Sequence, residues 1–105
     1  MSGNEILKRV RRQAAEVQIE AYFNPVGAYG HGPGAPVGIW NCQQGVPGRG
    51  ECPIADNCCY ALELCVAKQV SEWSKTLTLN LEETVAILGG KMQFLADRQS
   101  EFYLI

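Results

Sequence analysis

This 105-residue chain has little net charge, no long apolar run and no secretory signal, and each of these absences excludes a class of protein. The net charge is only −2, from nine Lys or Arg against eleven Asp or Glu, which argues against a protein that binds nucleic acid or an anionic membrane. No apolar run approaches the roughly 20 residues of a membrane helix. The first residues, MSGNEILKRVRRQ, lack the apolar core of a secretory signal. We therefore expect a soluble, cytoplasmic protein with no membrane partner.

Recognisable catalytic patterns are also missing. The sequence contains no G-x-S-x-G, H-E-x-x-H or Walker motif. Its single histidine, His31, allows one Cys–His dyad at most, and no local motif places that histidine beside a cysteine. The sequence therefore favours a non-catalytic protein and leaves such a dyad as the alternative.

Glycine and proline are confined almost entirely to the middle of the chain. All five prolines and eight of the eleven glycines fall between residues 25 and 53. Before them, apolar residues recur at steps of three and four, which predicts a helix over about residues 4–23. The residues of this stripe are Leu7, Val10, Ala14, Val17 and Ala21. A second helix is predicted over about 53–74, because Pro53 suits a first helical turn and the following residues are apolar on two sides of a helical wheel.

A third helix is predicted over about residues 80–100. From Leu81 to Phe102, apolar residues alternate steps of four and three, and Asn80 with Glu83 has the spacing of a capping box. Gly89-Gly90 would then mark a kink or a close helix crossing. The stretch LTLNL could instead form a short strand, but the sequence shows no obvious partner for it.

These patterns predict a mostly α fold, with three helices in a single domain and a long irregular Gly/Pro-rich segment over residues 24–52. The second helix is apolar on two sides, and apolar residues continue through EFYLI. Because a chain of this size has difficulty burying so much apolar surface alone, we expect a homodimer.

The five cysteines leave three interpretations open. They are Cys42, Cys52, Cys58, Cys59 and Cys65, and their spacing matches neither zinc knuckles nor ferredoxin runs. Because the number of cysteines is odd and the sequence shows no signal peptide, reduced thiols or a metal site are favoured over a disulfide framework. The thiols are then structural, redox-active, or ligands of a zinc ion or an iron–sulfur cluster held by Cys42, Cys52 and Cys58 or Cys59.

The Gly/Pro-rich segment in the middle of the chain is the predicted location of the binding site. Its glycines let backbone N–H groups approach a ligand, and its prolines reduce the order lost on binding. Tyr29, His31 and Trp40 offer stacking surface, and Arg49 offers a charge for an anionic group. We therefore expect a non-catalytic binding or inhibitor-type interaction protein that uses segment 27–50 to contact a protein or a small ligand. It would need no cofactor. The alternative is a thiol- or metal-dependent redox protein centred on the cysteines.

Overall fold

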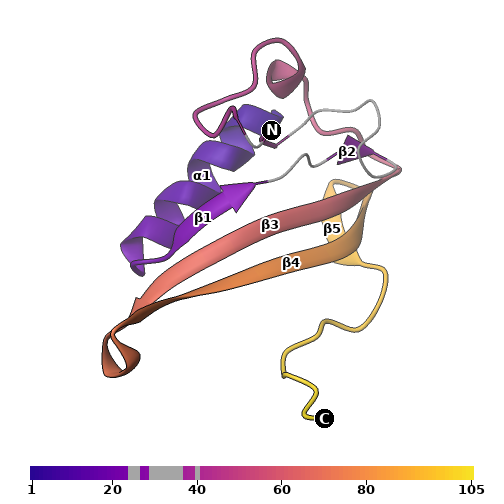
Figure 1. The fold of residues 1–105 in the computed structure, drawn as a ribbon. Coiled ribbons are helices and arrows are strands. Elements are labelled where there is room, and N and C mark those ends of the chain that lie inside the picture. The colour runs from indigo at the N-terminus through magenta and orange to yellow at the C-terminus, as the bar shows by residue number, and fades with distance from the viewer. Residues whose placement is uncertain (24–26, 29–36, 40) are drawn as a thin grey trace.

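The computed structural model describes residues 1–23, 27–28, 37–39 and 41–105, and within them it contains one α-helix and one antiparallel sheet (Figure 1). The predicted mostly α, three-helix fold is therefore wrong. None of the helices in these residues is both long and apolar enough to cross a membrane.

Helix α1 (Gly3–Glu16) begins where the sequence predicts and ends seven residues before the predicted end at 23. Ser2 and Glu5 form a capping box: the Glu5 N–H donates to Ser2 Oγ at 3.2 Å, and the Ser2 N–H donates to Glu5 Oε2 at 2.6 Å. The Ser2 N–H also holds the pKa of Glu5 below its ordinary value. After the helix, Gln18 takes a left-handed φ of 58°, and the chain turns into a strand.

The sheet has the order β1-β3-β4-β5, with β2 also paired to β3. Its strands are β1 (Glu20–Phe23), β2 (Gly27–Ala28), β3 (Cys58–Val70), β4 (Lys75–Leu88) and β5 (Lys91–Phe94). Strands β3 and β4 form a long hairpin whose register runs from Cys58 opposite Ile87 to Val70 opposite Lys75. The helices predicted over 53–74 and 80–100 are thus strands for most of their length.

Alternation along β3 and β4 explains this outcome. The residues of these two strands that face α1 are mostly apolar, and Thr76, Thr78 and Thr84 occupy the opposite face of β4. The apolar positions are Cys58, Tyr60, Leu62, Leu64, Val66, Val70, Leu77, Leu79, Leu81, Val85 and Ile87. Many of them also fit a 3.6-residue period, so the apolar pattern alone does not separate strand from helix.

The two turns between the long strands use residues with positive φ. Ser74, with φ 51°, closes the short 3-10 turn η2 (Ser71–Trp73) between β3 and β4. Gly89 and Gly90, with φ of 60° and 72°, form the two-residue connection between β4 and β5. Positive φ at both positions is what a type I′ hairpin turn requires. The two glycines therefore reverse the chain and do not kink a helix.

The core lies between α1 and one face of the sheet. Its buried members come from α1, from the loop after β2 and from strands β1, β3 and β4: Leu7, Val37, Phe23, Tyr60 and Val85. The Tyr60 hydroxyl accepts a hydrogen bond from the Ala55 N–H at 2.9 Å, and burial raises its pKa.

Two carboxamide side chains attach the loop of residues 41–51 to this core. Asn4 Oδ1 accepts from the Val46 N–H at 2.7 Å, and Asn4 Nδ2 donates to the Val46 carbonyl at 3.2 Å. Gln43 bonds in the same two-way manner to the main chain of Phe23, at 2.9 and 2.6 Å. The later part of the predicted irregular segment is therefore packed against the helix and β1, and it includes a 3-10 turn, η1 (Arg49–Glu51).

Candidate interaction surface

The residues predicted to bind a partner are only partly described by the structure. Tyr29, His31 and Trp40 lie outside the described residues. Arg49 begins η1 and is exposed. Of these four side chains only that of Arg49 is described, and segment 27–50 stays a predicted binding surface.

The four predicted metal-ligating cysteines lie in two different settings. Cys42 is half-buried and Cys52 is exposed, and both belong to the loop before β3. Cys58 and Cys59 are the first two residues of β3, and consecutive strand residues point to opposite faces of a sheet. All five cysteines carry free thiols, and the described part of the chain holds no group of three or more His, Cys, Asp or Glu that could bind a metal ion.

One long side of β4 has no partner strand among the described residues. Strand β4 pairs with β3 from Lys75 to Ile87, but with β5 only from Val85 to Leu88. A single further backbone bond, from Leu95 N–H to the Thr84 carbonyl at 3.1 Å, continues this ladder. The outer side of residues 75–83, which we call the β4 edge, is therefore open.

The direction of the backbone groups on this edge follows from the ladder. The Thr84 carbonyl points away from β3, and groups in an antiparallel strand alternate from residue to residue. The N–H and C=O groups of Thr76, Thr78, Asn80 and Glu82 therefore point outward. Such a row of unpaired groups is a template for another strand.

A row of exposed leucines follows the same edge. Leu77, Leu79 and Leu81, which we call the leucine stripe, occupy the face of the sheet that carries the core residue Val85. They lie beyond the core, since Leu77 is 39% exposed and Leu81 is 47% exposed. A row of large apolar side chains beside an open strand edge is typical of a protein-binding surface.

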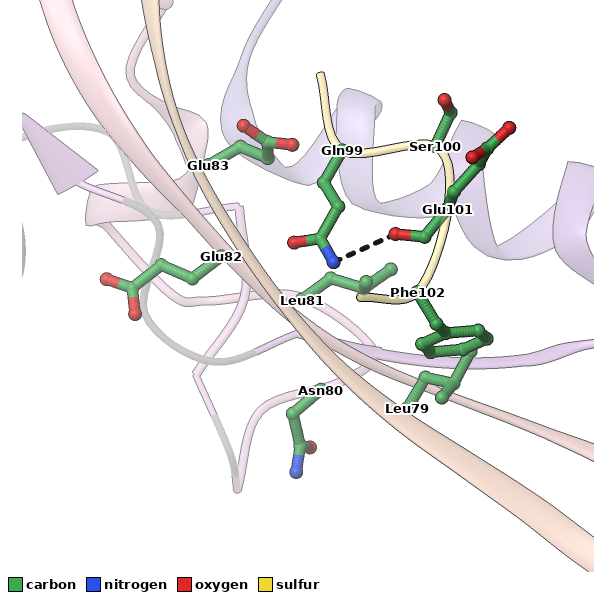
Figure 2. A pocket seen from close by; sticks show the side chains of 9 residues that line it. All are labelled: Leu79, Asn80, Leu81, Glu82, Glu83, Gln99, Ser100, Glu101 and Phe102. Carbon is green, nitrogen blue, oxygen red and sulfur yellow. Dashed lines mark hydrogen bonds between the residues drawn. The ribbon is translucent and has the colours of Figure 1, made fainter. Parts of the chain in front are cut away.

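The chain after β5 forms the other wall of a groove along this edge. Figure 1 shows this tail passing β4 on the side away from β3. The groove has a volume of about 390 Å³ and is lined by residues 79–83 of β4 and residues 99–102 of the tail. In Figure 2, Leu79 and Leu81 point toward the tail, and Phe102 lies beside Leu79. The tail leaves its own apolar side chains outside, with Phe102 72% exposed and Tyr103 85% exposed.

The lining of the groove is acidic, and its two β4 glutamates lie at the Glu83 end of the β4 edge. Glu82, Glu83 and Glu101 belong to its lining, and no Lys or Arg is among the lining residues. The other end of the β4 edge begins with Lys75. The edge therefore carries opposite charges at its two ends.

Sequence reasoning placed function in the middle of the chain and missed this edge. The signal was present as the alternation in KTLTLNLEET and as the Gly-Gly turn that follows it. Comparison of the chain with protein-family models, curated proteins and solved structures finds no match. The interpretation therefore depends on the geometry of the chain itself.

Proposed function

We propose that the protein is a non-catalytic interaction protein that binds an extended polypeptide segment along the β4 edge. The observation that carries this proposal is the open edge of residues 75–83 with the leucine stripe beside it. A bound strand would take its affinity from the outward backbone groups, and the stripe would select apolar side chains at alternate positions. We also propose a cytoplasmic location, which is supported by the five free thiols, since a reducing compartment maintains thiols in that state.

Two other functions stay hypotheses. Binding through segment 27–50 depends on Tyr29, His31 and Trp40, and a redox role depends on a reactive or metal-bound cysteine. The β4 edge is preferred because its backbone groups and side chains are placed together by the fold.

Placing charges on the leucine stripe tests the proposal. The double variant Leu77→Lys, Leu81→Lys puts two ammonium groups where a bound strand would pack, and both sites are exposed enough to accept lysine without disturbing the core. Leu88→Lys is the matched control, because Leu88 is 44% exposed but lies at the β4–β5 turn.

Each tagged variant is incubated with untagged chain and with native lysate, and the retained polypeptides are quantified by mass spectrometry. We expect the wild-type chain and Leu88→Lys to retain the same polypeptide, and the double variant to lose it. Equal retention by all three, or no polypeptide retained by any of them, would contradict the proposal.

A further inference from the structure

We propose that the strand bound at the β4 edge is β4 of a second copy of this chain, paired antiparallel about a two-fold axis at Leu79. This inference rests on the proposed function and names the partner of the same surface. It derives from the backbone pattern, the side chains that each register brings together, and the charges at the two ends of the edge.

The backbone pattern limits the registers that two copies can adopt. The outward N–H and C=O groups belong to the even-numbered residues from Thr76 to Glu82. Hydrogen-bonded pairs form only where outward residues of the two strands lie opposite each other. The axis must therefore pass through a residue position, so that even-numbered residues oppose even-numbered residues.

An axis at Leu79 uses the whole edge, because Leu79 is the midpoint of residues 75–83. Thr76 then lies opposite Glu82 of the second copy, and Thr78 lies opposite Asn80 of the second copy. These pairs and their symmetry mates supply about eight backbone hydrogen bonds between the copies. The result is one continuous sheet through both copies.

The same register matches the side chains on the face of the leucine stripe. Leu77 lies opposite Leu81 of the second copy, and Leu79 lies opposite its own symmetry mate. At each end, Lys75 lies opposite Glu83 of the second copy. Directly opposed side chains have Cβ atoms about 5 Å apart, close enough for apolar contact and for ion pairing.

Neighbouring registers give poorer matches. An axis at Thr78 places Lys75 opposite Leu81, and an axis at Asn80 places Leu77 opposite Glu83. Both put a charge against a leucine and shorten the apolar contact. The Leu79 axis is therefore the register in which the edge is complementary to itself, as a two-fold interface requires.

The ends of the paired segment fit as well. In this register the turn η2 of one copy adjoins the end of β5 of the other. Trp73 in η2 is 64% exposed, and Leu95 after β5 is 59% exposed. The dimer thus places these two segments, each with an exposed apolar residue, next to each other. Because residues 99–102 of the tail line this side of β4 from Leu79 to Glu83, the tail has to move away from the edge for the second strand to pair there (Figure 2).

Charge reversal at the two ends tests the register with the full-length chain. Lys75→Glu places two carboxylates opposite each other at both ends of the homodimer, and Glu83→Lys places two ammonium groups there. Each single variant should therefore raise the dimer dissociation constant by about tenfold or more, measured by sedimentation velocity from about 1 to about 500 µM chain.

Mixing the two variants restores both ion pairs. In the heterodimer, Glu at position 75 of one copy faces Lys at position 83 of the other, and the native Glu83 faces the native Lys75. We expect an equimolar mixture to dimerise within about threefold of the wild-type constant. Lys91→Glu is the matched control, since it makes the same charge change on β5 outside the edge and should leave the constant unchanged.

Three results would overturn the inference. The first is a wild-type chain that is monomeric throughout this range. The second is a dimer whose constant does not respond to the charge reversals. The third is a dimer lost when the exposed tail is changed by Phe102→Lys with Leu104→Lys, while Lys75→Glu has no effect; the occupant would then be a tail exchanged between copies. In the first case the lysate capture with the Leu77→Lys, Leu81→Lys variant still decides whether the edge binds another polypeptide.

Discussion

Replacing Asn4 by alanine should release the loop of residues 41–51 from α1. The Asn4 carboxamide accepts from the Val46 N–H at 2.7 Å and donates to the Val46 carbonyl at 3.2 Å. Its Nδ2 also donates to Glu51 Oε1 at 2.6 Å. Val46 is only 4% exposed, so water does not readily replace these bonds. The substitution therefore leaves the buried Val46 N–H without a partner, while the Val46 carbonyl loses one bond and keeps the one from the Gly50 N–H at 3.0 Å.

The expected loss combines the unpaired Val46 N–H with the bond lost at the Val46 carbonyl. A net hydrogen bond contributes about 1 kcal/mol, and an unpaired buried polar group costs about 1–3 kcal/mol. The bond to the exposed Glu51 adds little. We therefore expect Asn4→Ala to lower the free energy of unfolding by about 2–4 kcal/mol, a large part of the roughly 5–15 kcal/mol typical of a domain.

Urea unfolding followed by circular dichroism measures this difference. Arg9→Ala is the matched control, because Arg9 is exposed on the same helix. Asn4→Asp separates the two directions of bonding: the aspartate still accepts from Val46 but cannot donate to it. It should therefore lose stability as well. A loss below about 0.5 kcal/mol for Asn4→Ala would refute the reasoning, since it would equal that of an ordinary surface substitution.

Three further predictions concern the fold. Gly38→Ala should cost about 1–3 kcal/mol in urea unfolding, because a Cβ there would lie 2.8 Å from Phe23 Cβ; a neutral result would contradict that packing. Gly90→Val should cost about 1–2 kcal/mol, since valine is strained at a φ of 72°, and an unchanged melting temperature would argue against the turn. Tyr60→Phe should cost about 1 kcal/mol at neutral pH by removing the bond from Ala55. Because burial raises the pKa of Tyr60 above 10.0, the unfolded chain loses this proton first, so stability falls as the pH rises above that value. The phenylalanine variant should lose less stability on the alkaline side, and identical alkaline slopes would exclude this assignment.

The start of the fold is predictable from local signals, and its centre is not. The apolar stripe over the first turns predicts a helix, and α1 is there. The stripe also includes Ala21, although residues 20–23 form β1. The helix stops because Gln18 is left-handed and Phe23 pairs with Leu64, and that contact is distant in sequence.

The predicted second and third helices fail for a related reason. Residues 58–70 and 75–88 each fit a helical period in part, and each also alternates as a strand. What decides between them is the pairing of the two segments with each other over thirteen residue pairs. The stretch LTLNL lacks a visible partner in the sequence because that partner, residues 64–68, belongs to a segment that resembles a helix when taken alone.

The sequence predicts that the chain has an interaction surface, but it does not predict where that surface lies. An excess of apolar residues in the sequence predicts a homodimer, which stays a proposal. The position of the surface depends on which strands lack partners, and only the sheet order shows that β5 covers just Val85 to Leu88 of β4. The Asn4 and Gln43 carboxamides likewise show that part of the Gly/Pro-rich segment has a structural role, which composition alone does not show.

Amide hydrogen exchange along β4 tests the central claim most directly. Individual rates are measured by NMR for the wild-type chain at high concentration and for Lys75→Glu. In the dimer, the N–H groups of Thr76, Thr78, Asn80 and Glu82 bond to the second copy, so we predict that they are protected in the wild type and exchange rapidly in the variant. The odd-numbered amides of β4 bond to β3 and should be protected in both. Equally rapid exchange of the four even-numbered amides in both proteins would contradict the account.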